Sequence, residues 1–366
     1  MNATSFRESV FLVAGREVTQ RLRSKSFVIS TLILFAIVLG SILITGFISR
    51  ANADSTAPVA GVGAAIAELE TLPGVEVVEA ATIAEAEQLV RDEEVDAAVV
   101  PLDGASADGP VPFEIVALDE APGGLVGALS IAPDVRLLEE PGLPFGLLYL
   151  VAFGFGIVFF LSAVTFGGTI AQSVVEEKQT RVVEILLSSI SARALLAGKV
   201  VGNSILAFGQ IIAIAALAAL GLVLTGQDVL VADLGPAVGW FLGFFAIGFV
   251  LLAAMYAASA SLVSRMEDVG SVLTPVTYLV MIPYFLVIFL FDNALVLTIM
   301  SYVPFSAPVG MPMRIFLDQA AWWEPILSLV VLAVSTVIIV MLGARVYQNS
   351  LLRTGSRVKL GEALKG

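Results

Sequence analysis

A short charged stretch between two long apolar stretches is the part of this sequence best placed to do chemistry. Glu176, Glu177 and Lys178 are followed by Arg181 and Glu184, with apolar residues between the last two. In one continuous helix, Glu177, Arg181 and Glu184 fall on one face, because they are spaced by four and then three residues. Such a helix can lie at a membrane boundary and present charges to a soluble partner. The alternative is an ordinary solvated helix, in which a Glu177–Arg181 pair contributes only about 0.3 to 0.5 kcal/mol.

The composition excludes most kinds of catalytic site. The chain has no histidine and no cysteine, which rules out the usual zinc sites, Ser-His-Asp and Cys-His nucleophiles, and disulfides. Gly198-Lys199 continues into Val200, so it lacks both the upstream glycine and the hydroxyl of a phosphate-binding loop. We therefore expect no catalytic residue, no metal site, no cofactor and no ATP hydrolysis in this chain itself.

Composition also indicates a membrane protein. The chain is 58% hydrophobic and only 14% charged, far from the balance of an ordinary globular domain. Six apolar windows reach the roughly 20 residues that a helix needs to cross the hydrocarbon core of a bilayer. The sequence thus predicts an all-α polytopic membrane protein with six transmembrane helices. The windows are residues 27–48, 145–171, 200–224, 237–263, 269–291 and 325–346.

The positions of the basic residues predict how the helices cross the membrane. If the N-terminus is cytoplasmic, all but four of the 19 lysines and arginines fall on the cytoplasmic side. The positive-inside rule favours this topology, with both termini cytoplasmic, in the cell membrane. Residues 1–26 are expected to form an amphipathic helix in the inner interface, with a solvated basic tail as the alternative. Residues 347–366 are expected to form a cytoplasmic tail.

A different kind of sequence separates the first two windows. Residues 50–143 carry 19 acidic and three basic side chains. Their pattern predicts a small extracytoplasmic α/β domain, inserted between the first and second transmembrane helices. Solubility explains the negative charge, and a cation-collecting role is the less favoured alternative. The predicted strands are 58–62, 75–78, 97–100 and 113–118, and the predicted helix is 82–91, with Thr82 as its N-cap.

These residues together carry a family resemblance. The charged stretch at 176–186, followed by Ser191, Leu195 and Gly198-Lys199, resembles the segment after the second membrane helix in permeases of type 2 ABC exporters. The likeness covers nearly the whole chain, and it is greatest to the sodium-extrusion and drug or peptide export branch. It implies a permease that couples ATP hydrolysis in a separate subunit to export of a cation, drug, lipid or peptide.

The resemblance also implies partners and roles for particular residues. A cytoplasmic coupling helix at 173–197, with Glu176, Glu177, Arg181 and Glu184, would transmit movements of an ABC ATP-binding subunit, which carries ATP and Mg²⁺. A second permease copy or a homologue would complete the pathway in the lipid bilayer, and no nucleic acid is involved. The alternative is a membrane-anchored sensor or assembly factor, whose extracytoplasmic domain binds a ligand.

Within the predicted bundle, 145–346, two polar residues are candidates for the pathway. Asn203 and Gln210 are seven residues apart and share one helix face. Amides in a bilayer usually point into a bundle or cavity, and hydrogen bonds between helices are the favoured alternative. Gly239 and Gly243 form a small-xxx-small pair, for which close helix packing is the default explanation.

Prolines mark candidate gate positions. Pro275 and Pro283 can kink the fifth transmembrane helix and free backbone carbonyls, which is useful to a gate but also common in passive packing. Pro304 and Pro308 lie in an apolar stretch, 293–324, that prolines prevent from forming one continuous helix. We expect short helices there, in a broken or re-entrant segment at the outer end of the bundle, which is a plausible exit gate.

Overall fold

The computed structural model describes residues 5–54, 57–72, 74–101, 113–118, 123–129, 145–226, 228–353 and 358–365. The chain forms two compact units, one comprising Ile44–Gly142 and the other Met1–Leu43 with Leu143–Gly366. Some of the predicted segments lie partly outside the described residues, namely 1–4 of the N-terminal helix, 55–56, 73, 102–112, 119–122 and 130–143 of the insert, and 354–357 and 366 of the tail.

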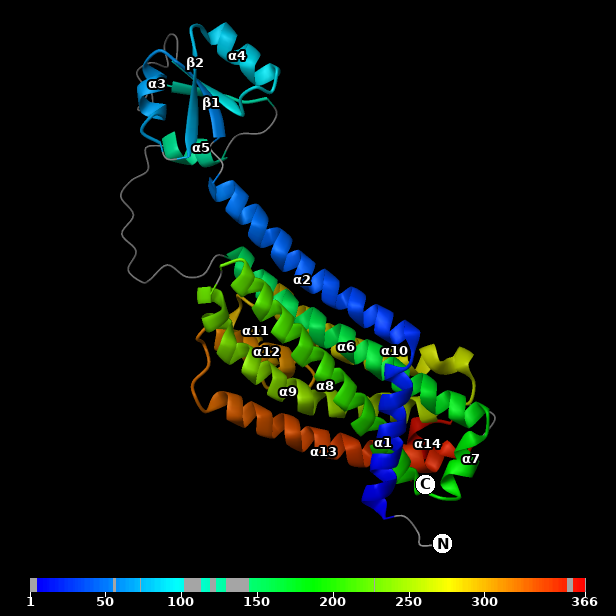
Figure 1. Ribbon diagram of the computed structural model, residues 1–366. Helices are drawn as coiled ribbons and strands as arrows, with labels where there is room; N and C mark the ends of the chain where they lie inside the picture. The colour runs from blue at the N-terminus through cyan, green and yellow to red at the C-terminus, as the bar shows by residue number, and fades with distance from the viewer. Residues whose placement is uncertain are drawn as a thin grey trace. The chain divides into compact units, whose positions relative to one another are not determined.

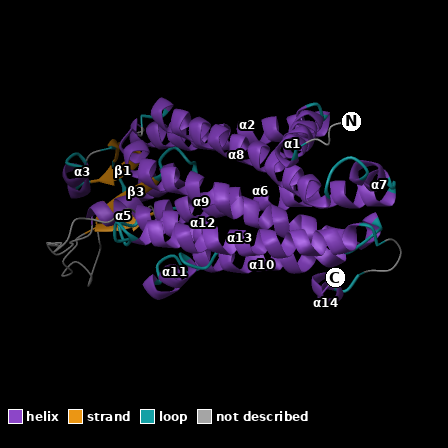
Figure 2. Ribbon diagram, turned by 90° about the horizontal axis from the view of Figure 1, so that it is seen from below, coloured by secondary structure: helices purple, strands orange, loops and turns teal. Residues whose placement is uncertain are grey.

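Among the residues that the structure describes, six helices are long and apolar enough to cross a membrane, which confirms the predicted fold class. They run side by side in Figures 1 and 2. Several extend beyond the predicted windows, because polar and charged residues continue the helices past their apolar centres. The six are α2 (Lys25–Asp54), α6 (Phe145–Gln179), α8 (Ala192–Leu224), α9 (Asp228–Ser261), α10 (Val269–Phe289) and α13 (Glu324–Leu351).

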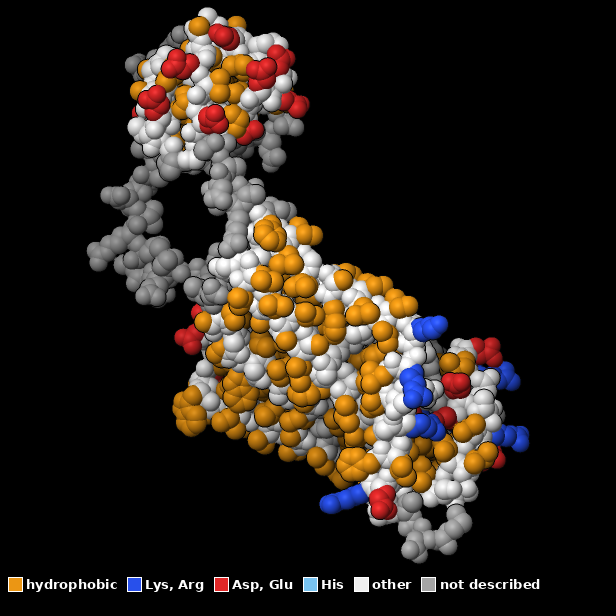
Figure 3. Space-filling view, viewed as in Figure 1, with side chains coloured by type: hydrophobic (Ala, Val, Ile, Leu, Met, Phe, Trp, Pro, Cys, Tyr) orange, Lys and Arg blue, Asp and Glu red, His pale blue; other side chains and the backbone are white. Residues whose placement is uncertain are grey.

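The core of the bundle is built around α9, which packs against α6, α8 and α13. Phe159 and Phe166 of α6 contact Phe245 and Phe249 of α9 edge-to-face, a preferred geometry for aromatic pairs. Helix α2 is different, because no residue in its most apolar 18-residue window is buried within the chain. Its side chains, together with others on the outside of the bundle, form the broad hydrophobic surface visible in Figure 3, which suits contact with lipid.

Short helices cover the two ends of the bundle. Helices α1 (Phe6–Leu22), α7 (Val182–Leu187) and α14 (Leu360–Lys365) lie at one end (Figure 1), where lysine and arginine side chains gather (Figure 3). We call this the basic end. Helices α11 (Ala294–Met300) and α12 (Ala307–Phe316) lie at the opposite end, as expected for a proline-broken segment.

Much of the predicted tail, 347–366, is helical. Helix α13 continues to Leu351, and α14 packs onto it and onto the last turn of α9. The contact is apolar and includes Leu262, Val346, Val358 and Ala363. Residues 358–365 are therefore part of the basic end of the bundle.

The smaller unit is an α/β fold with a sheet in the order β2-β1-β3-β4. Strand β1 pairs in parallel with β2 and β3, and β4 is antiparallel to β3. Successive side chains of a strand point to opposite faces of the sheet, so the unit has two hydrophobic cores. One core lies between the sheet and α4 (Ile83–Arg91), and the other lies between the sheet and helices α3 (Ala64–Leu69) and α5 (Gly123–Leu129). The predicted strands and the Thr82 cap are confirmed. The strands are β1 (Ala57–Val62), β2 (Val75–Ala80), β3 (Ala97–Pro101) and β4 (Phe113–Val116).

Candidate functional site

The charged stretch that opened the sequence analysis forms a sharp turn. Helix α6 ends at Gln179, and Arg181 adopts the left-handed conformation with φ of 59° before α7 begins at Val182. The prediction of one continuous helix was therefore wrong, and Glu177, Arg181 and Glu184 do not share a helix face. The predicted coupling helix, 173–197, consists of the end of α6, all of α7 and the first turns of α8. Nothing in the sequence indicates the break, since left-handed backbone usually coincides with glycine or asparagine.

The turn and α7 expose both charged and apolar side chains. We call Glu176, Arg181, Val182, Glu184 and Ile185 the docking surface, because all five are exposed. Ile185 is 72% exposed and Val182 is 39% exposed. Val183, between them, is buried and anchors α7 to the bundle. An exposed apolar pair rimmed by charges is typical of a surface that contacts a protein partner.

Glu177 does not belong to this surface. Its carboxylate is almost fully buried and forms an ion pair with Lys199 of α8, with 3.0 Å between Nζ and Oε2. Lys199 Nζ also lies 2.9 Å from Oε1 of Glu17 in α1 and donates to Ser173 Oγ at 2.6 Å. Arg16, at the edge, donates a hydrogen bond to Glu177. We call Arg16, Glu17, Glu177 and Lys199 the inner polar cluster; it joins α1, α6 and α8.

Glycines of α8 make this cluster possible. A Cβ added at Gly198 would lie 2.4 Å from the Cβ of Val13, and one at Gly202 would lie 2.9 Å from the carbonyl oxygen of Ala14. Helix α1 therefore lies directly on the backbone of α8, where only glycine permits so close an approach. Gly198 thus provides the space, and the neighbouring Lys199 provides the charge that α1 requires.

Lys178 has a third environment. Its side chain is buried, and Nζ donates to the carbonyl oxygens of Ser261 at 2.7 Å and Ser350 at 2.9 Å. These carbonyls lie in the last turns of α9 and α13. Carbonyls there have no partner within their own helix and carry partial negative charge, so an ammonium group is stabilised between them. Sequence analysis missed this contact, because the two carbonyls lie 83 and 172 residues away.

Helix α1 begins with a local signal that the sequence does contain. Ser5 Oγ accepts from Glu8 N at 3.3 Å, and the Glu8 carboxylate accepts from Ser5 N at 2.8 Å, which is a capping box. The backbone hydrogen bond from Ser5 lowers the pKa of Glu8 below its ordinary value. At the other end of α1, burial lowers the pKa of Arg21, against the opposing effects of Glu17 and Glu176. Arginine nevertheless keeps its charge at neutral pH.

The opposite end of the bundle contains a second polar cluster, which sequence analysis also missed. Arg314 is buried in α12 and pairs with both carboxylate oxygens of Glu324, at 3.0 and 2.9 Å. It also donates to Ser301 Oγ at 3.1 Å. Tyr302 donates to Glu324 at 2.9 Å, and burial together with this bond raises the pKa of Tyr302. The cluster fixes α12 and the preceding turn to the start of α13.

Among the predicted pathway residues, the two amides of α8 differ in their surroundings. Asn203 is fully buried, and its Nδ2 donates to the carbonyl of Lys199 in the same helix at 2.9 Å. Its Oδ1 has no hydrogen-bond partner among the described residues. Gln210, two turns further along, is half-buried. The described contacts thus give Asn203 a bond within α8, whereas the sequence favoured a bond between helices.

The predicted gate prolines occupy different positions. Pro275 is exposed and Pro283 half-buried within α10, which continues through both of them as one helix. Pro304 is half-buried in the turn between α11 and α12. Pro308, in the first turn of α12, packs against α9, where it would lie 2.7 Å from a Cβ added at Gly248. The structure thus places Pro308 and Pro304 at the opposite end and brings neither next to Pro275.

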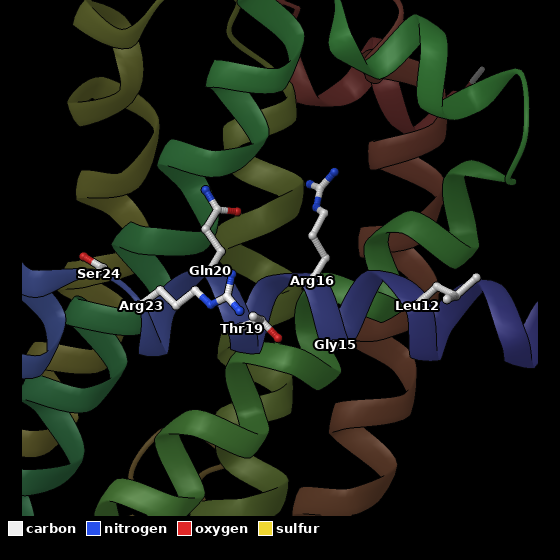
Figure 4. A pocket seen from close by; sticks show the side chains of 7 residues that line it. All are labelled: Leu12, Gly15, Arg16, Thr19, Gln20, Arg23 and Ser24. Atoms are coloured by element: carbon white, nitrogen blue, oxygen red, sulfur yellow. The ribbon is translucent and has the colours of Figure 1, made fainter.

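An open pocket of about 710 Å³ lies along α1 and the turn that follows it. Figure 4 shows that its labelled side chains, which include Arg16, Gln20 and Arg23, all come from this one segment. It contains neither Asn203 nor Gln210. This pocket is therefore a groove on the surface of the basic end, separate from the predicted pathway residues.

Comparison with known proteins places the bundle in a family. A match to the family described as "ABC-2 family transporter protein" covers residues 138–345. The uncharacterized protein YhaP of Bacillus subtilis is 28% identical over 247 residues, which is 63% of this chain and 57% of that protein. An uncharacterized protein of Methanocaldococcus jannaschii is 29% identical over 221 residues, 60% of this chain and 54% of its own length. The matches thus span little more than half of these relatives, and no solved structure matches this chain.

The family match covers more than half of the chain and includes the second to sixth spanning helices, the docking surface and both polar clusters apart from α1. The ABC-2 family comprises membrane components of transporters, which generally lack an ATPase site of their own and work with an ATP-binding subunit. The arrangement of six apolar helices and the family match agree. This chain is a multi-pass membrane protein and belongs to the ABC-2 family of transporter permeases.

Proposed function

We propose that the chain is the permease subunit of an ATP-driven exporter, in which a separate ABC ATPase subunit docks on α7. ATP and Mg²⁺ are then bound by the partner, and this chain forms the path across the membrane. Membership of the ABC-2 family supports this division of labour, because its members are membrane components. The sodium-extrusion and drug export resemblance of the sequence supports export as the direction.

The docking surface is the single observation that carries this proposal. Val182 and Ile185 are exposed at the end of the bundle rather than along its sides, where exposed apolar residues contact lipid. Glu176, Arg181 and Glu184 surround them with charges of both signs. A buried apolar anchor with a charged rim is the usual composition of a protein interface.

Movement of the partner can reach the bundle through α7 because the connections on both sides are short. Thr180 and Arg181 join α7 to the end of α6, and four residues after Leu187 separate α7 from the start of α8 at Ala192. Ser191 caps α8 by accepting from Ala194 N at 3.2 Å. Displacement of α7 therefore acts directly on the ends of α6 and α8.

The proposal includes an orientation. The basic end faces the cytoplasm, where the ATPase is, and the acidic α/β unit is outside. The distribution of lysine and arginine supports this orientation through the positive-inside rule. The exposed Trp322 and Trp323, beside the start of α13, suit the outer interface of the membrane.

The proposal also includes a second copy of the permease or a homologue. Gly239 and Gly243 of α9, which the sequence assigned to packing between helices, have no described atom within 4 Å of an added Cβ. Their face of α9 is thus open in one copy and allows the close approach of another helix. We expect native mass measurement in mild detergent to find two permease chains with two ATPase subunits.

The test of ATPase docking is a pair of substitutions within the docking surface. Ile185→Asp removes the apolar anchor, and Glu184→Lys reverses a rim charge. Both residues are exposed, so the variants should insert and fold normally. Ile185→Asp should reduce the ATPase recovered with the purified permease by about tenfold or more, the effect of losing an anchor residue. Glu184→Lys should have a smaller effect, which depends on salt concentration.

Matched controls keep the test specific. Glu362→Lys makes the same charge change on the exposed face of α14, and Leu118→Asp places a carboxylate on an exposed apolar residue of the α/β unit. Both controls should recover the ATPase as wild type does. The recovered protein is identified by its phosphate-binding loop in mass spectrometry and by its ATP hydrolysis. Equal recovery from Ile185→Asp and from wild type would show that α7 is not the docking site.

A further inference from the structure

Three consecutive residues at the end of α6 point to three different places. Glu176 is exposed on the docking surface, Glu177 is buried against α1 and α8, and Lys178 is buried against α9 and α13. The three lie just before the turn at Arg181. The segment that leads into α7 is therefore joined to two separate groups of helices by two adjacent side chains.

Lys178 makes an unusual contact for a buried cation. Its ammonium group is held by the carbonyl oxygens of Ser261 and Ser350, and it forms no ion pair with a carboxylate of the described residues. Burying a charge without a counter-ion is costly, and an apolar side chain of similar size would avoid this cost. An apolar side chain, however, cannot donate hydrogen bonds to two carbonyls, so it cannot hold two different helices at a fixed separation as Lys178 does.

Two further polar contacts lie at the ends of α9 and α13. Val358 N donates to the carbonyl of Leu262 at 2.9 Å, just after α9, and Ser264 Oγ lies 3.4 Å from the carbonyl oxygen of Arg353, just after α13. The apolar contact with α14 covers the same junction. Lys178 binds a carbonyl oxygen of each helix, so it holds the two ends at their separation and connects both to α6.

Glu177 connects α6 to the second group of helices, α1 and α8. Its carboxylate binds Lys199 of α8 and Arg16 of α1, and Lys199 in turn binds Glu17. At Gly198 and Gly202, α1 lies directly against the backbone of α8, so these two helices are packed as a pair. The carboxylate of Glu177 is thus the contact of α6 with the pair.

We propose that Glu177 and Lys178 are positioning residues that connect the docking turn rigidly to both groups of helices, α1 with α8 and α9 with α13. A displacement of α7 then moves all four of these helices together with α6. The inference rests on the proposed function only in attributing the displacement to an ATPase. The connection itself is a property of this chain and can be tested without a partner.

The first part of the test uses the permease alone. The chain has no cysteine, so Ser264→Cys and Arg353→Cys introduce a single reporter pair across the α9–α13 junction, cross-linked by a short bis-maleimide. The Ser264 hydroxyl contact is then absent from every variant compared, so differences in yield report on Lys178. In an otherwise unchanged chain the pair should cross-link efficiently. Lys178→Met should lower the cross-linking yield at least about threefold, and Lys178→Arg, which keeps donors and charge, should restore most of it. Arg265→Met removes an exposed cation at the same end and should leave the yield unchanged.

The second part measures coupling in the complex with the ATPase. Lys178→Met should retain the ATPase within about twofold, because the docking surface is intact, yet lower permease-dependent ATP hydrolysis at least about threefold. Lys178→Arg should recover hydrolysis, and Arg265→Met should match wild type. If Lys178→Met does not accumulate, Lys178→Gln replaces it. Glutamine has no charge and a shorter side chain but keeps an N–H donor, so its losses should lie between those of Lys178→Met and Lys178→Arg.

The outcomes separate this inference from the proposed function. Wild-type cross-linking and wild-type hydrolysis in Lys178→Met would overturn the inference. A second outcome would also overturn the inference. If Lys178→Met is less stable to heat but its folded fraction cross-links and supports ATP hydrolysis normally, Lys178 contributes only to stability. Failure of the wild-type chain to bind any ATPase would overturn the proposed function, and the cross-linking result would still decide whether Lys178 connects the two helices.

Discussion

Lys199 is the residue on which the inner polar cluster depends. Its side chain is fully buried, and its ammonium group lies within 3.0 Å of carboxylate oxygens from both Glu17 and Glu177. Two buried carboxylates this close together need a buried cation between them, because both have lost hydration. Arg16 also pairs with both carboxylates, but its side chain is 41% exposed, so solvent screens its charge and it compensates them less than Lys199 does.

We therefore expect Lys199→Met to lower the stability of the permease by about 3 to 5 kcal/mol, the usual effect of removing one partner of a buried ion pair. The measurement is the midpoint of thermal unfolding in detergent. Adding Glu177→Gln to Lys199→Met removes one of the stranded carboxylates and should recover part of the loss. This account would be contradicted if Lys199→Met were as stable as wild type. It would also be contradicted if the double variant lost as much stability as Lys199→Met and Glu177→Gln lose together.

The residue types at this site could be predicted from the sequence, but their contacts could not. Glu176, Glu177 and Lys178 stand out as charges beside an apolar stretch, which correctly marks the end of a spanning helix. Whether each is buried depends on elements far away in the chain, since Glu177 contacts residues of α1 and α8 and Lys178 contacts α9 and α13. Arg314 likewise could be assigned to a loop, while its pairing with Glu324 depends on how α12 folds back.

At the scale of elements, the turn at Arg181 decides the direction of α7. The left-handed conformation costs an ordinary residue about 1–2 kcal/mol, and glycine avoids this cost. Arg181→Gly should therefore be more stable than Arg181→Val by about 1–2 kcal/mol. Neither variant has the guanidinium group, so their difference reports on the backbone alone. Thermal unfolding of the two purified variants makes the comparison, and equal midpoints would mean that the turn relaxes out of this conformation.

The elements that were predictable are those that local patterns specify. Alternating apolar residues marked the strands of the α/β unit, Thr82 marked the start of α4, and the prolines after Asn293 marked a broken segment. The short helices α3 and α5 were missed, because six or seven residues contain too little of the helical period to be distinguished from a loop. The break between α6 and α7 was missed because neither glycine nor proline occurs there.

At the scale of the whole molecule, the two ends of the bundle differ in how they are held together and in what they expose. The basic end is held by charged side chains that join five helices, and it exposes α7. The opposite end is closed by α11 and α12, which the Arg314–Glu324 pair fixes to α13. The proposed docking surface therefore lies at one end of the bundle only, and an ion pair between short and spanning helices holds the other end.

The direction in which this asymmetric bundle crosses the membrane can be tested by labelling. Because the chain has no cysteine, Ala84→Cys in α4 and Glu362→Cys in α14 each provide one exposed thiol. If the basic end is cytoplasmic, an impermeant maleimide added to intact cells should label position 84 and spare position 362. After the membrane is permeabilised, both positions should react, which shows that both thiols are accessible. Labelling of position 362 but not of position 84 in intact cells would mean that the topology is inverted. Helix α7 would then lie on the side of the membrane that has no ATP. Labelling of both positions in intact cells would instead require an odd number of spanning helices, since six helices with an N-terminus inside return the C-terminus to the cytoplasm.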